Sequence, residues 1–288
     1  MAAPISEPVK DELAFSKWKI VSYHAVLWVP LSILIGMILL CFAGPFVFSA
    51  PGPNAGNILV ANHPIFSNGH ILGTDPSGND VASRILYGGR ISIEVGLGSV
   101  LIGLIIGATL GAGSALKGGI VDQIIPRLFD MLLSFPALIL TLVVAENLGP
   151  SESHVIFAIA YFQVPAVGRL ARANTLRLRE LEFISVAKLS GTSDFKILLR
   201  HIAPNIIPQL MTFAFLGVSI AIIVEASLSF LGFGVPPPNP SWGNMIALGQ
   251  QYLATEPALI FVPAAFLFVT VASLNMVGDA LRLRWVQA

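Results

Sequence analysis

Charge is scarce in this chain, and this scarcity sets its class. Of the 288 residues only 11% are charged, against roughly 25% in soluble domains, while 55% are hydrophobic. Because the apolar residues also come in long blocks, the sequence predicts a protein that crosses the membrane several times. Cysteine is nearly absent as well. The single Cys41 excludes an intrachain disulfide and a zinc site built from several cysteines.

Catalytic and phosphate-binding motifs are missing too. No lysine follows a glycine, which excludes the GxxxxGK[ST] loop that binds nucleotide phosphates. The 5 histidines show neither an HExxH pair nor another metal-ligand spacing, and no serine stands in G-x-S-x-G. We therefore expect no enzyme activity, no metal and no cofactor in this chain. Acidic residues dilute the basic cluster between Arg169 and Arg200, which argues against a nucleic-acid partner.

Six stretches are apolar and long enough to cross the hydrocarbon core, which takes about 20 helical residues. The fourth is interrupted by Gln163 and Pro165, so we expect a kinked helix there. The predicted spans are Val26–Phe48, Ser92–Leu116, Ile124–Ala145, His154–Leu170, Ile207–Phe233 and Ala258–Gly278. The expected fold class is an all-α membrane protein with six transmembrane helices.

The first span raises the alternative of a cleaved signal peptide. Its apolar core is longer than the roughly 7–15 residues of such a peptide, and a long polar segment precedes it. We therefore interpret it as a retained anchor. The predicted organisation is a cytoplasmic tail (1–25), a first transmembrane helix (26–48), an extracytoplasmic loop (49–91) and a five-helix core (92–288).

The basic residues predict the orientation. All lysines and arginines except Arg84 and Arg90 fall on one set of alternating loops, and basic loops stay cytoplasmic. Both termini and the loop at about 178–205 are therefore expected inside. The opposite side carries Gly73–Asp80, whose ligand spacing does not fit a calcium loop of the EF-hand type. We predict a turn leading into a helix there.

Small residues follow one face of the second predicted span. Gly103, Gly107 and Gly111 recur every four residues, which places them in line along a helix. Such a line lets two helix backbones approach closely inside lipid. We expect tight helix packing at this face rather than a functional site.

The cytoplasmic segment Glu182–Asn205 combines charge with much apolar surface. Gly191 divides it into two predicted short helices, and the first carries a narrow polar stripe at Glu182, Ser185 and Lys188. The rest of that helix is apolar and has to be buried against something. Patterning alone leaves two alternatives open: an amphipathic helix pair lying on lipid, and a docking element inserted into a cytoplasmic partner.

This segment resembles the coupling loop, or EAA motif, of bacterial ABC importer permeases. Gly191 and Pro204 match the Gly and Pro of the motif and Ala187 matches its second Ala, while Ser185 and Val186 depart from its Glu-Ala. The resemblance implies that the segment sits in a groove of a separate ATPase subunit. Gly191→Pro is then expected to uncouple transport from ATP hydrolysis. The implied coupling residues are Glu182, Ser185, Ala187, Lys188, Gly191, Asp194, Arg200 and Pro204.

Further stretches narrow the resemblance to one subfamily, the C-type permease subunit of dipeptide, oligopeptide and nickel importers. Residues 73–84 are similar to its GTD-x-x-GRDV-x-SR signature, with Asn79 in place of the usual Arg. Glu94 stands where an apolar residue is expected. Leu133–Pro136, Glu225–Gly232 and Pro240–Met245 are similar to the same subfamily's third span, fifth span and following loop.

This resemblance implies a type I ABC importer permease in the bacterial cytoplasmic (inner) membrane. Its partners would be a B-type permease, two ABC ATPase domains that hold ATP and Mg, and an extracytoplasmic solute-binding protein. The solute would be a di- or oligopeptide, or alternatively nickel or another small solute. The outer residues expected to be exposed, as gate or docking candidates, are Asp75, Asp80, Arg84, Arg90 and Trp242.

One acidic residue lies deep within a predicted span. Glu225 is about two thirds along the fifth span, where an ionised carboxylate is costly and usually faces a cavity or a partner. Two roles stay open: Glu225 lines the pathway and meets a peptide's amino group, or it is hydrogen-bonded and holds the two permeases together.

Two other classes compete with an ABC permease. A stand-alone secondary transporter needs a coupling-ion site made from broken helices and intramembrane acids, and this chain offers one central Glu225. A redox enzyme subunit needs paired histidines within spans for haem, whereas only His154 lies at the edge of a span. Both alternatives are weaker than the permease hypothesis.

Overall fold

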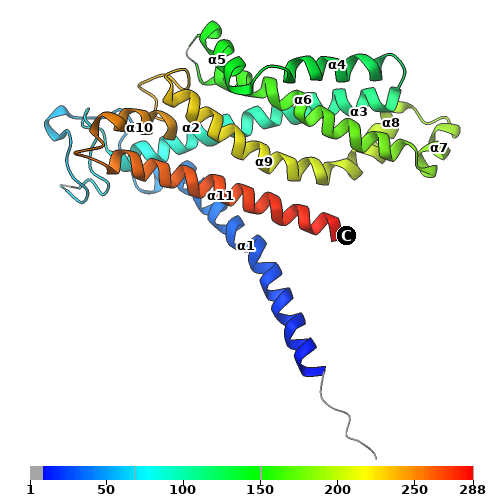
Figure 1. The fold of residues 1–288 in the computed structure, drawn as a ribbon. Coiled ribbons are helices and arrows are strands. Elements are labelled where there is room, and N and C mark those ends of the chain that lie inside the picture. Colours follow the sequence, from blue (N-terminus) through cyan, green and yellow to red (C-terminus); the bar gives the residue numbers. More distant parts are fainter. Residues whose placement is uncertain (1–8, 68, 150, 288) are drawn as a thin grey trace, which may run out of the picture.

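The computed structural model describes residues 9–67, 69–149 and 151–287. Within these ranges the chain is helical, with turns and short irregular segments between the helices (Figure 1). The α-helices are α1 (Val9–Val47), α2 (Val81–Ile102), α3 (Ala108–Lys117), α4 (Val121–Leu133), α5 (Ala137–Leu148), α6 (Glu152–Arg179), α7 (Glu182–Leu189), α8 (Asp194–Ile197), α9 (Ala203–Phe230), α10 (Trp242–Gly249) and α11 (Ala258–Gln287). The short elements η1 (Ile58–Val60) and η4 (Gln250–Tyr252) are 3₁₀ turns, and η2 (Gly103–Gly107) and η3 (Leu198–Ile202) are π turns.

Five continuous helices in the described residues are long and apolar enough to cross a membrane. A sixth candidate is the pair α4 and α5, if the two count as one span. The five helices cover Leu27–Val47, Val81–Lys117, Glu152–Arg179, Asp194–Phe230 and Ala258–Arg284. Large apolar side chains stay exposed along them, such as Ile105 (66%) and Phe268 (70%), as lipid contact requires.

The third predicted span is not one straight helix. α4 and α5 meet at an angle of 86°, and the break falls at Ser134–Pro136. Pro136 has no amide hydrogen and disfavours helical geometry in the residue before it, so α4 ends just before this point. The prediction of six spans therefore holds only if this bent pair is counted as one.

Several helices extend beyond the predicted spans. α2 begins at Val81, well before the expected Ser92, because the Asp80 carboxylate accepts a hydrogen bond from the Ser83 amide (2.7 Å) and caps the helix. Likewise α6 continues to Arg179 and α11 to Gln287. Hydropathy marks only the apolar part of a helix, whereas backbone hydrogen bonding continues to the next cap or turn.

The line of glycines packs as predicted. Gly103, Gly107 and Gly111 face α6, where they lie directly against Gln163, Val164 and Gly168. A Cβ atom on any of the three would collide with α6 backbone or with the base of a side chain. The prediction of close helix packing is confirmed.

The main core lies between α2, α6, α9 and α11. Val95, Ile159, Ile222 and Leu274 represent these four helices in one buried cluster. α1 contacts α2 and α11 and diverges from the bundle toward its N-terminal end (Figure 1). The two ends of the bundle differ: α10 and the segment between α1 and α2 lie at one end, and α7, α8 and the C-terminal end of α11 lie at the other.

Candidate functional site: coupling segment and outer rim

The coupling segment, residues 182–205, follows α6 after a short turn. α7 ends in a Schellman arrangement, in which the Gly191 amide donates to the Lys188 carbonyl (3.0 Å) and the Thr192 amide to the Ala187 carbonyl (3.1 Å). Gly191 has a φ of 75°, a conformation open chiefly to glycine. The predicted helix break at Gly191 is confirmed.

The inner face of the coupling segment is fastened to the bundle. Ile184, Ile197 and Ile202 are fully buried, in a cluster that includes Ala112 of α3 and Val167 of α6. This packing fixes the position of α7 and α8 relative to the membrane helices.

The outer face of the coupling segment is exposed and carries large apolar side chains. Leu189 (89%), Phe195 (71%) and Val186 (61%) protrude. Of the eight predicted coupling residues, Ala187 is half-buried. The other seven are exposed: Glu182, Ser185, Lys188, Gly191, Asp194, Arg200 and Pro204. Within the described residues, none of their charged side chains forms an ion pair. Polar and apolar groups on this face are thus both available to a partner.

The second predicted short helix is not a separate element. From Asp194 the chain is helical through the π turn η3 and α9 to Phe230, and Pro204 lies in the first turn of α9. A proline is tolerated there because the wider π turn accommodates the lost backbone hydrogen bond. The prediction of a second short helix apart from the fifth span is therefore corrected: from Asp194 onward the coupling segment and the span are one continuous helix.

At the other end of this helix, Glu225 is fully buried within the chain. Its carboxylate accepts hydrogen bonds from the Ser92 hydroxyl of α2 (2.8 Å) and from the Ser229 hydroxyl of α9 (2.6 Å). Ser241, which precedes α10, donates to Ser229 (3.2 Å). Glu225 therefore joins α2, α9 and the start of α10, and it contacts groups of its own chain.

Trp242 was expected to be exposed, and this is wrong. Its side chain is 0% exposed, and its indole Nε1 donates to the Ile85 carbonyl (3.1 Å). Gly89 lies directly beneath the ring, so that α2 makes room for it. α10 starts at this residue because Ser241 and Asn244 form a reciprocal capping box. Trp242 thus fixes α10 to α2.

The loop at Asp75–Asp80 forms the predicted turn. The Asp75 carboxylate accepts hydrogen bonds from the amides of Ser77 (2.9 Å) and Asn79 (2.8 Å) and from the Asn79 side chain (2.9 Å). Asp80 caps α2 and also contacts His70 Nδ1 (2.8 Å). Both carboxylates therefore organise the loop. Asn79, which replaces the usual Arg of the signature, helps to hold Asp75.

Arg84 is also less accessible than expected. Its Nη1 donates to the Pro53 carbonyl and to the Asn54 side chain (both 3.2 Å), and its Nε lies 3.5 Å from Asp75. Its side chain is 8% exposed. The expectation that Arg84 lies free on the outer surface is corrected, because it ties the first loop to α2.

Arg90 remains partly accessible. It pairs with Glu94 one turn along α2 (2.8 Å), and its guanidinium lies 5.5 Å from the centre of the Phe42 ring. Glu94, which departs from the subfamily pattern, thus has a cation as its partner.

In the described part of the chain no group of three or more potential metal ligands gathers.

Sequence reasoning missed three serines of the Glu225 network. Ser229 was open to prediction, since it lies one helical turn after Glu225. Ser92 and Ser241 lie in other elements, and nothing in their local sequence indicates the contact.

Comparison with known proteins agrees with this architecture. Residues 99–286 match the family described as "Binding-protein-dependent transport system inner membrane component". The chain belongs to this family. The permease is 41% identical to the glutathione transport system permease protein GsiD of Pectobacterium atrosepticum, over 75% of its own length and 72% of the relative's. It is 36% identical to the dipeptide transport system permease protein DppC of Alkalihalophilus pseudofirmus, over 97% of its own length and 93% of the relative's.

A solved structure shows the same fold. The permease superposes on a chain of the inward-facing MetNI methionine ABC transporter with a TM-score of 0.55 at 17% identity. The match covers 70% of the permease and 94% of that chain. The permease is therefore a multi-pass membrane protein with the fold of an ABC importer permease.

Proposed function

We propose that the permease is the transmembrane subunit of an ATP-driven importer of di- and oligopeptides in the bacterial cytoplasmic membrane. It would form half of the translocation pathway, and a B-type permease would form the other half. Family membership and the named relatives support this proposal. The distribution of basic residues supports an orientation with the coupling segment and both termini in the cytoplasm.

The observation that carries the proposal is the two-faced coupling segment. Its inner face is buried in the bundle, while Leu189, Phe195 and Val186 protrude from a short, rigidly held element. Exposed apolar groups of this size on a water-facing turn indicate a protein partner. We propose that the partner is an ATPase subunit whose groove covers this face, and that ATP and Mg are bound there and not by the permease.

Coupling would follow the continuous helix from Asp194 to Phe230. This helix has 37 residues, or roughly 55 Å at 1.5 Å per residue. It begins at the coupling segment and ends near the Glu225 network, which joins it to α2 and α10. A movement imposed on its cytoplasmic end would therefore reach the outer end of the bundle. ATP binding shifts the permease between orientations only as far as it favours one of them.

The substrate class rests on two relatives. One is named for dipeptide transport and the other for glutathione, which is itself a tripeptide. Both solutes carry a free amino group and at least one free carboxylate on a short chain. We therefore propose short peptides as the substrates, ahead of nickel or other small solutes.

The test is uptake into liposomes that contain the permease, its B-type partner and the two ATPase subunits. With binding protein outside and ATP inside, we expect accumulation of labelled dipeptide or glutathione. A catalytically inactive ATPase should abolish it. Uptake that persists without ATP hydrolysis would instead support a secondary transporter, and uptake of nickel complexes alone would reject peptides as the substrate class.

A further inference from the structure

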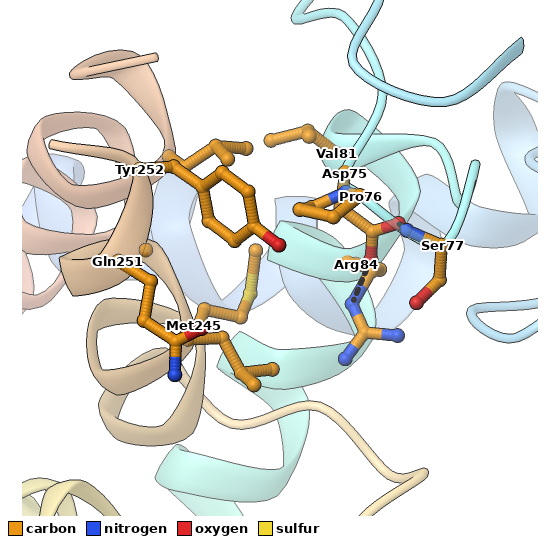
Figure 2. Close-up of a pocket in the computed structure, with 11 residues that line it drawn as sticks. Asp75, Pro76, Ser77, Val81, Arg84, Met245, Gln251 and Tyr252 are labelled. Carbon is orange, nitrogen blue, oxygen red and sulfur yellow. Dashed lines mark hydrogen bonds and ion pairs between the residues drawn. The ribbon is translucent and has the colours of Figure 1, made fainter. Parts of the chain in front are cut away.

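A small cavity at the outer end of the bundle plays no part in the mechanism described above. It has a volume of about 170 Å³ and lies between the Asp75–Arg84 segment on one side and α10 and η4 on the other (Figure 2). Met245, Leu248 and Leu259 form an apolar wall, and Ser77, Gln251 and Tyr252 bring polar groups. We call this cavity the rim pocket.

Arg84 supplies the rim pocket with a buried and fixed cation. Its Nη1 donates hydrogen bonds to the Pro53 carbonyl and the Asn54 side chain, and its Nε faces Asp75. Among the described residues, its Nη2 donates to no acceptor, although the side chain is only 8% exposed. The guanidinium is thus fixed in position, and the N–H groups of its Nη2 remain available as donors.

Other groups at the rim pocket also have hydrogen-bonding capacity to spare. Figure 2 shows the Tyr252 hydroxyl pointing across the pocket toward the segment that carries Asp75 and Arg84. No hydrogen bond of the Tyr252 hydroxyl or the Gln251 amide joins another described side chain. Asp75 also brings a negative charge to the pocket, but that charge is already paired: its Oδ2 lies 3.5 Å from Arg84 Nε, and its Oδ1 accepts hydrogen bonds from the amides of Ser77 and Asn79. The pocket therefore offers donors and suits an occupant that accepts hydrogen bonds, of which a carboxylate is the strongest.

The volume of the rim pocket decides between two sources of a carboxylate, an acidic protein side chain and a whole transported peptide. A cavity of about 150 Å³ holds a six-atom ring such as benzene, whereas the smallest dipeptide has about nine heavy atoms. The rim pocket thus fits an aspartate or glutamate side chain and is too small for a whole transported peptide. It also lies at the end of the bundle opposite the coupling segment (Figure 1).

We propose that the rim pocket receives an acidic side chain of the extracytoplasmic solute-binding protein when that protein docks on the permease. This inference rests on the proposed function, since it requires such a binding protein. Docking would place the carboxylate against Arg84 Nη2 and the Tyr252 hydroxyl, and the apolar wall would exclude water from the contact. A cation already held in place needs little reordering, so the contact favours binding.

The first test fills the pocket without touching Arg84, because Arg84 also holds the first loop. Leu248→Trp adds bulk at the pocket wall, while Leu253→Trp is the matched control. Both leucines are about half exposed, and Leu253 does not line the pocket. We expect Leu248→Trp to raise the Kd of the reconstituted complex for its binding protein about tenfold, with little change for Leu253→Trp. An unchanged Kd for Leu248→Trp overturns the proposal.

The second test identifies the occupant. All natural lysines lie on the predicted cytoplasmic side, so Gln251→Lys places an amine at the pocket and Thr255→Lys places one on the exposed turn beyond it. Carbodiimide coupling joins such an amine to a carboxylate that it contacts. We expect mass spectrometry to find one predominant adduct, between Gln251→Lys and an aspartate or glutamate of the binding protein. An equal or higher yield from Thr255→Lys contradicts docking in the pocket.

Failure of this proposal differs from failure of the proposed function. If the complex assembles with its ATPases and imports peptide, but Leu248→Trp binds the binding protein normally, only the rim pocket assignment is wrong. If the unsubstituted permease shows no ATP-dependent uptake at all, the proposed function itself is wrong.

Discussion

Two regions at opposite ends of the bundle, the surroundings of Trp242 and the coupling segment, treat their large apolar side chains differently. At the proposed outer end the large Trp242 is fully buried, and Glu225, Asp75 and Asp80 are all hydrogen-bonded within the chain. At the coupling end Leu189 and Phe195 protrude into solvent. The same helix, Asp194–Phe230, connects both ends. The difference shows that the surroundings of Trp242 are packed within the chain, whereas the coupling segment leaves apolar surface for a partner to cover.

This contrast predicts that substitutions of Trp242 and the groups around it mainly change stability, and that those on the outer face of the coupling segment mainly change assembly. A large apolar residue removed from a satisfied core leaves a cavity. The same residue removed from an exposed docking face leaves the isolated permease unaffected.

Trp242→Ala should have the largest effect. It removes a fully buried indole and its hydrogen bond to Ile85, which costs about 3–5 kcal/mol of the free energy of unfolding. Thermal unfolding in detergent measures this loss. Trp28→Ala is the matched control, since Trp28 is 58% exposed on α1 and its removal leaves no cavity. Equal losses for the two variants would mean that the outer end is not the rigid part of the molecule.

Phe195→Ala should come next, and it should act on assembly. We expect the affinity of the permease complex for its ATPase subunits to fall about 30-fold, or ~2 kcal/mol, with thermal unfolding of the permease unchanged. Phe268→Ala removes an equally exposed ring from α11 and should change neither quantity. Titration of purified ATPase subunits against the reconstituted permeases makes the measurement. Unchanged affinity for Phe195→Ala would favour the alternative in which this face lies on lipid.

Glu225→Gln tests whether the buried carboxylate is only structural. The amide keeps one acceptor oxygen for Ser92 or Ser229, so we expect a loss of about 1 kcal/mol in the free energy of unfolding. Uptake per folded complex should then stay near normal. Glu146→Gln, at an exposed carboxylate near the end of α5, should be neutral in both measurements. A loss of uptake far larger than the loss of stability would instead place Glu225 on the substrate pathway.

Sequence patterns predicted local features well and contacts between distant elements poorly. The helix break at Gly191, the turn before α2 and the packing of Gly103 against α6 each depend on a few neighbouring residues or on one helical repeat. The burial of Trp242 and Arg84 depends on where α10 and the first loop fold back, which no local pattern records. For this reason Trp242 and Arg84, which were expected on the surface, are buried and connect separate elements.

The continuity of the coupling segment with α9 was missed for a related reason. Pro204 ordinarily indicates the end of a helix, but the preceding π turn absorbs the missing hydrogen bond and the helix continues. A π turn has no simple sequence signal. The break between α4 and α5 shows the reverse case, since Pro136 lies within an apolar run that hydropathy alone treats as one span.

Gly191→Ala should have an effect as small as that of Glu225→Gln but confined to one segment, and it tests how firmly the coupling segment is held. A Cβ at this position meets nothing within 4 Å, so the only cost is the positive φ of 75°, about 1 kcal/mol. Gly113→Ala is the matched control, because that glycine is helical and equally open, and alanine should stabilise it by about 0.5–1 kcal/mol. Amide hydrogen exchange resolves the effect locally: faster exchange in α7 and α8 alone is expected for Gly191→Ala. If exchange quickened throughout α9 as well, the segment and the span would open as one unit, contrary to the expectation that the turn at Gly191 stabilises the segment alone. If exchange quickened in neither, the Schellman turn would not be what holds the outer face in place.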